Sequence, residues 1–533
     1  MNKLLLLITT VITLHFAVKT NAQAPVLGTS STFALFSTNG AVSNTGLSHL
    51  TGNVGTNNGP DNNFGNVDGV MHNANGTTVA AAADLTLAYN QLNAAIPNFF
   101  PAPLLGNGET LNEGTYFINQ SATLNNTLTL DGQGNENALF IFQVQGSFSS
   151  GAGAQVELIN GALACNVFWK IEGLVDLATN TSIKGTIIAN NAAIILNSGV
   201  SLEGRALSTT GAVTVSGVTV TMPLGCGTPQ LTGPIAPPLN SVVCYTVFSG
   251  NGEVTNTGIS FVTGDIGTNV GLTTGFQTEN VIGTIHPNPN VSTAQCAADL
   301  NNVYSYLNTL PVDIELLFPA AFGHDLVLTP HTYLMNAATV FTGKVILNGQ
   351  DNPDAVFVIK INGALSTSTY ANVELINGTQ AKNVFWKIDG ATSLNDYADF
   401  KGTVIGNNGA VILNLGVQIE GRVLSTSGGI TTFGINAVMT PGCETMSTPS
   451  NTISNAVAQF YPNPFTDSIN VSLNDFNVEA IELKIYNSLG ALVLKTALTQ
   501  KDTHLPTKLS SGIYYYQIQG KDGVVQSGKL IAK

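Results

Sequence analysis

Short hydroxyl, methyl and amide side chains recur at every second position of several short segments, and apolar residues fill the positions between them. Because neighbouring residues of a β-strand point to opposite sides, the short row is expected to face outward. A rigid sheet with such a surface can anchor ordered water through its hydroxyls, while its methyl groups offer no competing bonds. In the first half of the chain the outward set is Ser43, Thr45, Ser121, Thr123, Asn125, Ser147, Ser149, Ala193, Asn197, Ala212, Thr214 and Ser216.

A corresponding set occurs in the second half of the chain. It is less regular, because Glu253 and the bulky Phe433 fall among its outward positions. We therefore expect it to be the weaker of the two binding surfaces. Its members are Thr255, Thr257, Ala338, Thr342, Ser366, Ser393, Asn395, Asn414 and Thr431.

The elements that position these residues are themselves repeated. The stretch NVFWKIEG at residues 166–173 returns as NVFWKIDG at residues 383–390, and the same offset of 217 residues relates VELING, KGTIIANN and LEGRALST to their later counterparts. The chain is thus expected to carry two copies of one domain. The predicted boundaries are a signal peptide at 1–22, domains at 24–226 and 240–443, linkers at 227–239 and 444–457, and a C-terminal domain at 458–533.

Each copy has a shorter internal period. Second strands start at residues 174, 192 and 211, which gives coils of 18 and 19 residues with three strands each. This pattern predicts a right-handed parallel β-solenoid of triangular section, so the fold class is mostly β: two tandem solenoids, then a small antiparallel β-sandwich. We name the faces by strand order, with residues 167–171 on the first-strand face, 174–177 on the second-strand face and 181–185 on the third-strand face.

One segment of each copy has helical periodicity. Thr78 and Ser292 are the expected N-caps, and apolar stripes follow, from Ala81 to Ile96 in the first copy and from Cys296 to Leu307 in the second. Such a helix must bury its stripe, and the first-strand face is apolar on both sides. We therefore expect the helix to cover this face, with Trp169 and Trp386 packed beneath it. The third-strand face carries long charged side chains, so elimination leaves the second-strand face as the binding surface.

Charge and residue clusters argue against other classes of function. Lys plus Arg number 18 against 32 Asp plus Glu, a net charge of −14, which disfavours nucleic-acid partners. The histidines and carboxylates are dispersed, so we expect no enzyme, cofactor or metal site. Of five cysteines, Cys244 and Cys443 are a hypothetical disulfide pair. The first 22 residues have a basic start, an apolar run and small residues, which are typical of a secretory signal peptide.

At this point the sequence resembles a known family. The order GNVGT (GDIGT in the second domain), inserted helix, GTYFI, ALFIFQVQG, NVFWKI, KGTIIANN and LEGRALS is similar to that of the microbial ice-binding proteins, and the match covers essentially all of both domains. The resemblance implies a discontinuous β-solenoid with a flanking helix, an ice crystal surface as the partner, and adsorption through a flat β face without cofactor or catalysis. We expect an antifreeze protein that inhibits ice growth and recrystallisation and acts as a monomer.

The C-terminal segment resembles a second family. YPNPF at 461–465, YNSLG at 486–490 and LSSGIYYY at 509–516 are similar to motifs of the type IX secretion sorting domain of Gram-negative bacteria. The resemblance implies that the outer-membrane secretion machinery is a partner and that the protein is secreted or held at the cell surface. An adhesin that attaches cells to ice or another surface is the alternative function, and a glycan-active enzyme is a more distant one.

Overall fold

The computed structural model describes residues 23–227, 230–443, 458–474, 481–488, 490–520 and 523–533. The predicted signal peptide, and the linker at 444–457, lie outside these residues. The chain divides into two compact units, residues 1–443 and 444–533. The predicted fold class is confirmed, because the first unit contains two parallel β-solenoids with one long helix each, and the second contains antiparallel sheets.

Solenoid 1 combines its first- and third-strand faces in one parallel sheet. The strands of this sheet are β1 (Phe33–Ser37), β3 (His49–Leu50), β4 (Asn53–Thr56), β6 (Met71–Asn73), β8 (Glu109–Asn112), β9 (Gly114–Ile118), β11 (Thr127–Asp131), β12 (Phe140–Val144), β14 (Gln155–Ile159), β15 (Val167–Ile171), β17 (Ser182–Ala189), β19 (Ser201–Ser208) and β21 (Thr219–Thr221). The second-strand face is a separate sheet in the order β5 (Asp61–Asn62), β2 (Val42–Thr45), β20 (Val213–Ser216), β18 (Ile194–Leu196), β16 (Val175–Leu177), β13 (Phe148–Ser150), β10 (Ala122–Asn125) and β7 (Leu104–Gly106).

This strand order makes the solenoid discontinuous. The early strand β2 pairs with the late strand β20 on one side and with β5 on the other. Helix α1 (Gly76–Ala94) lies between β6 and β7 in the chain, and these strands sit at opposite ends of the two sheets. The helix therefore carries the chain along the length of the solenoid before the remaining coils build back toward the first.

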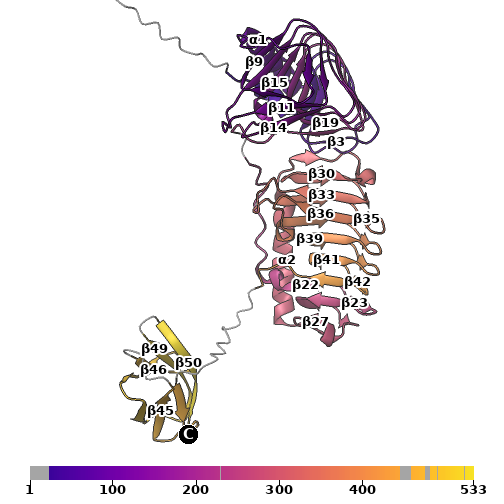
Figure 1. The fold of residues 1–533 in the computed structure, drawn as a ribbon. Coiled ribbons are helices and arrows are strands. Elements are labelled where there is room, and N and C mark those ends of the chain that lie inside the picture. The colour runs from indigo at the N-terminus through magenta and orange to yellow at the C-terminus, as the bar shows by residue number, and fades with distance from the viewer. Residues whose placement is uncertain (1–22, 228–229, 444–457, 475–480, 489, 521–522) are drawn as a thin grey trace, which may run out of the picture. The chain divides into compact units, whose positions relative to one another are not determined.

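Solenoid 2 repeats the arrangement with helix α2 (Val291–Thr309), and Figure 1 shows its strands as stacked rungs with α2 alongside. The first and third faces comprise β22 (Tyr245–Ser249), β24 (Phe261–Thr263), β25 (Asp265–Thr268), β27 (Val281–Ile282), β28 (Ile314–Glu315), β30 (Leu326–Leu328), β31 (Thr332–Met335), β33 (Lys344–Asn348), β34 (Phe357–Ile361), β36 (Asn372–Ile376), β37 (Val384–Ile388), β39 (Asp399–Gly406), β41 (Gln418–Ser425) and β43 (Asn436–Val438). The second-strand sheet has the order β26 (Thr273–Thr274), β23 (Val254–Thr257), β42 (Ile430–Phe433), β40 (Val411–Leu413), β38 (Thr392–Leu394), β35 (Leu365–Thr367), β32 (Thr339–Thr342) and β29 (Phe322–Gly323).

The N-cap residues of both helices differ from those predicted from the sequence. Asn75 and Asn290 are the N-caps, not Thr78 and Ser292. Thr78 is instead the third helical residue. Its hydroxyl accepts a hydrogen bond from the backbone N–H of Asn75, and the side-chain oxygen of Asn75 accepts one from the backbone N–H of Thr78. Both helices thus start with reciprocal capping boxes, which satisfy backbone donors that would otherwise be orphaned.

Each helix covers the first-strand face, as predicted, but the tryptophan prediction was wrong. Leu85 and Leu92 of α1 pack against Phe168, whereas Trp169 points into the solenoid core. The Trp169 ring stacks on Phe142 at 4.1 Å between centroids, and its indole nitrogen donates to the Lys184 carbonyl oxygen at 2.9 Å. The expected contribution of Ile96 was also wrong, because this residue follows the helix and is exposed.

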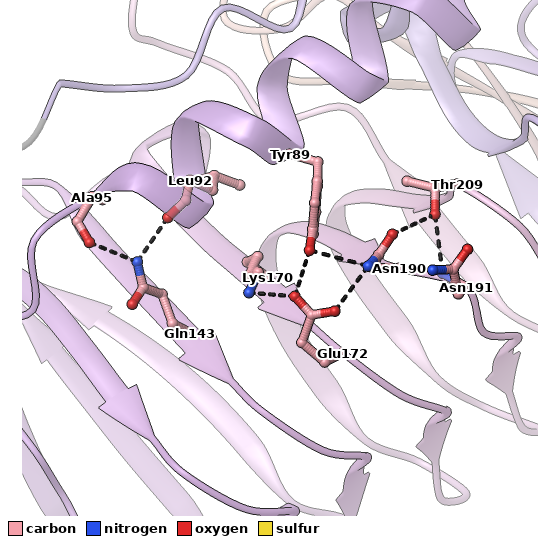
Figure 2. Close-up of polar contacts among 9 residues, drawn as sticks. All are labelled: Tyr89, Leu92, Ala95, Gln143, Lys170, Glu172, Asn190, Asn191 and Thr209. Carbon is pink, nitrogen blue, oxygen red and sulfur yellow. Dashed lines mark hydrogen bonds and ion pairs between the residues drawn. The ribbon is translucent and has the colours of Figure 1, made fainter.

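A polar cluster joins α1 to the first-strand face (Figure 2). Lys170 is 1 % exposed and forms an ion pair with Glu172. The Tyr89 hydroxyl of α1 donates to Glu172 at 2.6 Å, and the Asn190 amide donates to both Tyr89 and Glu172. A buried ammonium is tolerated only with such partners, so the cluster fixes the helix on the sheet.

The two solenoids meet through hydrogen bonds inside the first unit. Tyr333 donates to one carboxylate oxygen of the buried Asp68 at 2.5 Å, and Thr329 donates to the other at 2.8 Å. Burial raises the pKa of the Asp68 carboxyl, although His331 and these two donors oppose the effect. The junction therefore depends on a buried acid whose oxygens are both hydrogen-bonded.

The C-terminal unit is the predicted antiparallel sandwich. Its strands are β44 (Ala458–Tyr461), β45 (Ser468–Leu473) and β48 (Asp502–Pro506) in one sheet, and β46 (Ile481–Asn487), β47 (Leu492–Leu498), β49 (Gly512–Gly520) and β50 (Gly523–Ala532) in the other. Ile469 and Val471 of the first sheet share a core with Leu483, Ile485 and Ile518 of the second.

Candidate functional site

The second-strand sheets have the alternation that the sequence predicts. In β20, for example, Val213 and Val215 are buried in the core, while Thr214 and Ser216 are partly exposed. Every member of both predicted outward sets is at least partly exposed. The structure therefore brings the predicted residues together on one face of each solenoid.

Parallel pairing aligns these residues in rows that cross the coils. The central row of solenoid 1 is Asn62, Ser43, Thr214, Ile195, Asp176, Ser149, Thr123 and Leu104. The central row of solenoid 2 is Thr274, Thr255, Thr431, Ile412, Ser393, Ser366 and Val340. The first row contains the carboxylate of Asp176, whereas the second contains no charged side chain.

Hydroxyl groups on adjacent coils bond to one another along the rows. The hydroxyls of Thr123 and Ser149 lie 3.1 Å apart, and Ser147 donates to Ser121 at 2.9 Å. Thr255 donates to Thr431 at 3.3 Å on solenoid 2. These contacts restrict the rotamers of the hydroxyls, and a surface that is already ordered loses less entropy when it binds.

A flanking row contains a residue that sequence reasoning missed. Leu174, 41 % exposed, stands in the row of small residues that includes Ala193 and Ser147. The corresponding residue of solenoid 2, 217 positions later in the chain, is Ala391. Laying the two copies over each other would have identified Leu174, because a leucine replaces an alanine in an otherwise small outward row.

The other flanking row includes asparagines that bond inward. Asn197 donates to the Leu177 carbonyl oxygen at 2.7 Å, and Asn414 and Asn395 donate to the carbonyl oxygens of Leu394 and Thr367. Their amides satisfy backbone acceptors at the coil corners, so their first role is to support the edge of the face.

The remaining faces differ chemically. The third-strand face carries ion pairs such as Lys184–Glu203 at 2.8 Å, and the helices cover the first-strand faces. Disulfides join Cys165 to Cys226 and Cys244 to Cys443, the second being the pair considered from the sequence, and Cys296 is buried and free. Among the described residues, no group of three or more His, Cys, Asp or Glu side chains could hold a metal ion.

Known protein families match both parts of the chain. A family model described as Ice-binding-like matches residues 36–221 and 248–438. The chain belongs to the ice-binding-like family. A second model, described as a secretion system C-terminal sorting domain, matches residues 459–533. This sorting domain directs the ice-binding-like protein to the type IX secretion system, and thus to the cell surface or the medium. No helix in the described part of the chain is both long and apolar enough to cross a bilayer.

Individual relatives agree with the family assignment. A crystal structure of an ice binding protein from an Antarctic bacterium of the Flavobacteriaceae is 72% identical, with a TM-score of 0.78, and the match covers 79% of this chain and 100% of that one. An ice-binding protein of Nostoc sp. is 36% identical over 198 residues, 36% of this chain and 72% of its own length. One from Colwellia sp. is 29% identical over 213 residues, 37% of this chain and 82% of its own.

Proposed function

We propose that this exported ice-binding-like protein adsorbs to ice through the second-strand faces of its two solenoids, and thereby slows ice growth and recrystallisation. The observation that carries the proposal is the alignment of short side chains in rows across parallel coils. Coils repeat about every 4.8 Å, and outward residues of one strand about every 6.6 Å. Such a lattice can hold a layer of ordered water, and neither catalysis nor a cofactor is required. The protein acts as a monomer.

The mechanism follows from the size and stiffness of the face. Each hydroxyl makes only a weak contact with the water layer, but many contacts act together on a solid that does not diffuse away. Ice that grows between adsorbed molecules must curve outward. Curvature lowers the local freezing point, so growth stops until the temperature falls further.

A bulky residue in the central row tests the assignment of the face. Thr214→Tyr should leave the core intact, because the side chain points outward, but the ring should lift the flat surface from the ice. We expect the full chain to lose at least half of its thermal hysteresis, with unchanged circular dichroism and melting temperature.

The matched control is Thr219→Tyr, which places the same ring on the third-strand face of the same coil. This variant should keep its activity and its partition into a slowly grown ice crystal. Equal losses in Thr214→Tyr and Thr219→Tyr, or no loss in either, would contradict the proposed face.

The relative strength of the two faces stays a prediction. Solenoid 1 was expected to bind more strongly, because Glu253 and Phe433 interrupt the surface of solenoid 2. Two features of solenoid 1 weigh against stronger binding by this solenoid: the carboxylate of Asp176 in its central row and the exposed side chain of Leu174. Thr431→Tyr, compared with Thr214→Tyr in ice partition, measures the share of each face.

A further inference from the structure

Two tyrosines of solenoid 2 occupy backbone positions that side chains rarely adopt. Tyr370 and Tyr397 lie at the corner between the second- and third-strand faces of successive coils, with φ of +57° and +59°. A bulky residue in the left-handed region costs free energy and is a genuine outlier. Tyrosine at both corners therefore needs a reason beyond the turn itself.

Solenoid 1 makes the same corners without aromatic residues. The offset of 217 residues places Gly153 and Asn180 at these positions, with φ of +70° and +59°. Glycine and asparagine are the residues that adopt this conformation most readily. The turn is thus available at lower cost, and the tyrosines are an addition specific to solenoid 2.

The two rings form an exposed stack. Their centroids lie 5.2 Å apart with an angle of 12° between the planes, and Tyr370 and Tyr397 are 70% and 46% exposed. On its other side Tyr397 lies close over Gly416, since a Cβ added there would meet its ring at 2.6 Å. Both faces of the Tyr397 ring are therefore covered, one by Gly416 and the other by Tyr370. The stack has a free ring face only at Tyr370.

The corner next to Tyr370 along the solenoid carries no side chain. This corner is Gly343, where an added Cβ would meet nothing nearer than 4.0 Å. The coil beyond it turns at His324 and Asp325, both exposed, and Lys344 lies between Asp325 and Glu374 at 3.8 and 2.7 Å. Tyr370 therefore adjoins a corner that has no side chain, and charged side chains follow these corners on the third-strand face.

We propose that the exposed ring face of Tyr370, on the side of Gly343, binds a hexopyranose unit of an extracellular polysaccharide. A pyranose has a flat C–H face and a rim of hydroxyl groups, which match an aromatic ring and adjacent charged hydrogen-bonding groups. Carbon atoms in contact lie about 3.5–4.0 Å apart. A sugar stacked on Tyr370 therefore fits within the coil spacing of about 4.8 Å, at the level of Gly343. The ring of Tyr370 leaves most of its surface in water, where a ligand can reach it.

The decisive variant restores the corners of solenoid 1: Tyr370→Gly with Tyr397→Asn in the full chain. The backbone conformation stays allowed, so the melting temperature should be unchanged or higher. The native chain should be retarded in affinity gels that contain laminarin or dextran, and should give saturation-transfer NMR signals with methyl β-glucopyranoside or methyl α-mannopyranoside. The double variant should lose both responses at least tenfold, with unchanged ice partition.

A second variant leaves the tyrosines in place. Gly343→Asn puts the residue of solenoid 1, Asn126, at the corner beside Tyr370, and its side chain should obstruct the sugar and weaken retardation. The proposal is overturned if the native chain responds to none of the four saccharides, if the double variant binds as the native chain does, or if its only effect is a lower melting temperature. The ice-partition measurement keeps this outcome separate from any failure of the ice-binding face.

Discussion

At the scale of single residues, the carboxylate of Asp176 distinguishes the central row of solenoid 1. It accepts a hydrogen bond from Asn197 at 2.9 Å and is partly exposed among hydroxyl and aliphatic neighbours. A charged oxygen holds its hydration shell strongly, and that shell must be rearranged before an ordered water layer can continue across the row. Solenoid 2 has Ser393 at the corresponding position.

The first prediction exchanges these two residues. Asp176→Ser should raise the thermal hysteresis of solenoid 1, and Ser393→Asp should lower that of solenoid 2, each by about twofold. Each is measured in the full chain with the other face blocked, by Thr431→Tyr or Thr214→Tyr respectively. Asn197 keeps its bond to the Leu177 carbonyl oxygen, so the corner should remain folded. An unchanged or lower hysteresis for Asp176→Ser would show that the charge does not limit adsorption.

At the scale of elements, the contact between helix and sheet is built twice from the same parts. In solenoid 2, Lys387 pairs with Asp389, Tyr304 of α2 donates to that carboxylate at 2.6 Å, and Asn407 donates to Tyr304 at 2.9 Å. Among these four residues only the acid differs, Asp389 in place of Glu172. A stiff first-strand face in turn holds the second-strand face flat, because the two are sides of the same coils.

The acids of these clusters predict how stability depends on pH. Burial alone would raise the pKa of Glu172, but bonds from Asn190, Lys170 and Tyr89 outweigh it and lower the pKa. The pKa of Asp389 is lowered in the same way. The folded state favours the ionised carboxylates. Their contribution to stability is therefore fully present above the unfolded pKa values of about 4, and it is lost as the pH falls through the lower pKa values of the folded state. The contribution of these two acids to the melting temperature should be constant from pH 7 to about 5 and fall below about 4.

A charge-removing variant checks the cause. Glu172→Gln should destabilise the fold by about 3 kcal/mol at pH 7, because the buried Lys170 ammonium loses its counter-charge, and the loss should shrink in acid. The control is Glu203→Gln, which breaks a partly exposed ion pair with Lys184 and should cost less than about 1 kcal/mol. Equal effects of the two substitutions in calorimetry would contradict the structural role of the cluster.

Most elements could be predicted from the sequence, because periods of two and of 3.6 residues are local properties. The orientation of the first-strand face could not. Residues 167–171 are apolar on both sides apart from Lys170, so alternation alone does not decide whether Phe168 or Trp169 faces the core. The buried Lys170 decides it, since it shares the helix side with Phe168 and finds Glu172 and Tyr89 there. Such a partner from a distant helix cannot be found by periodicity.

The outward residues of the candidate face were predictable for the same local reason, whereas the rows that they form across the coils were not. Outward positions follow from alternation, but the rows that place Asp176 beside Ile195 and Ser149 depend on the register between coils. Loops of different length separate those coils, so the register is visible only in the structure. The exposed Tyr370 stack likewise depends on which corners become neighbours.

At the scale of the whole molecule, the chain carries two candidate faces inside one compact unit. Each solenoid is closed by its own disulfide, and buried hydrogen bonds to Asp68 join the two solenoids. Two faces on a restrained connection can act on one crystal, because adsorption of the first raises the effective concentration of the second. Two faces that cannot reach one crystal together gain nothing from being joined.

The last prediction separates these cases by blocking one face, the other, or both. If both faces engage one crystal, Thr214→Tyr and Thr431→Tyr should each raise the concentration needed to inhibit recrystallisation by about tenfold or more, since each removes the avidity as well as one surface. The double variant should be inactive while keeping its melting temperature. If the faces act independently, each single variant should lose only its own share and the two losses should add up to the native activity. Additive losses in a recrystallisation assay would therefore contradict joint engagement, and would leave two separate ice-binding surfaces in one exported chain.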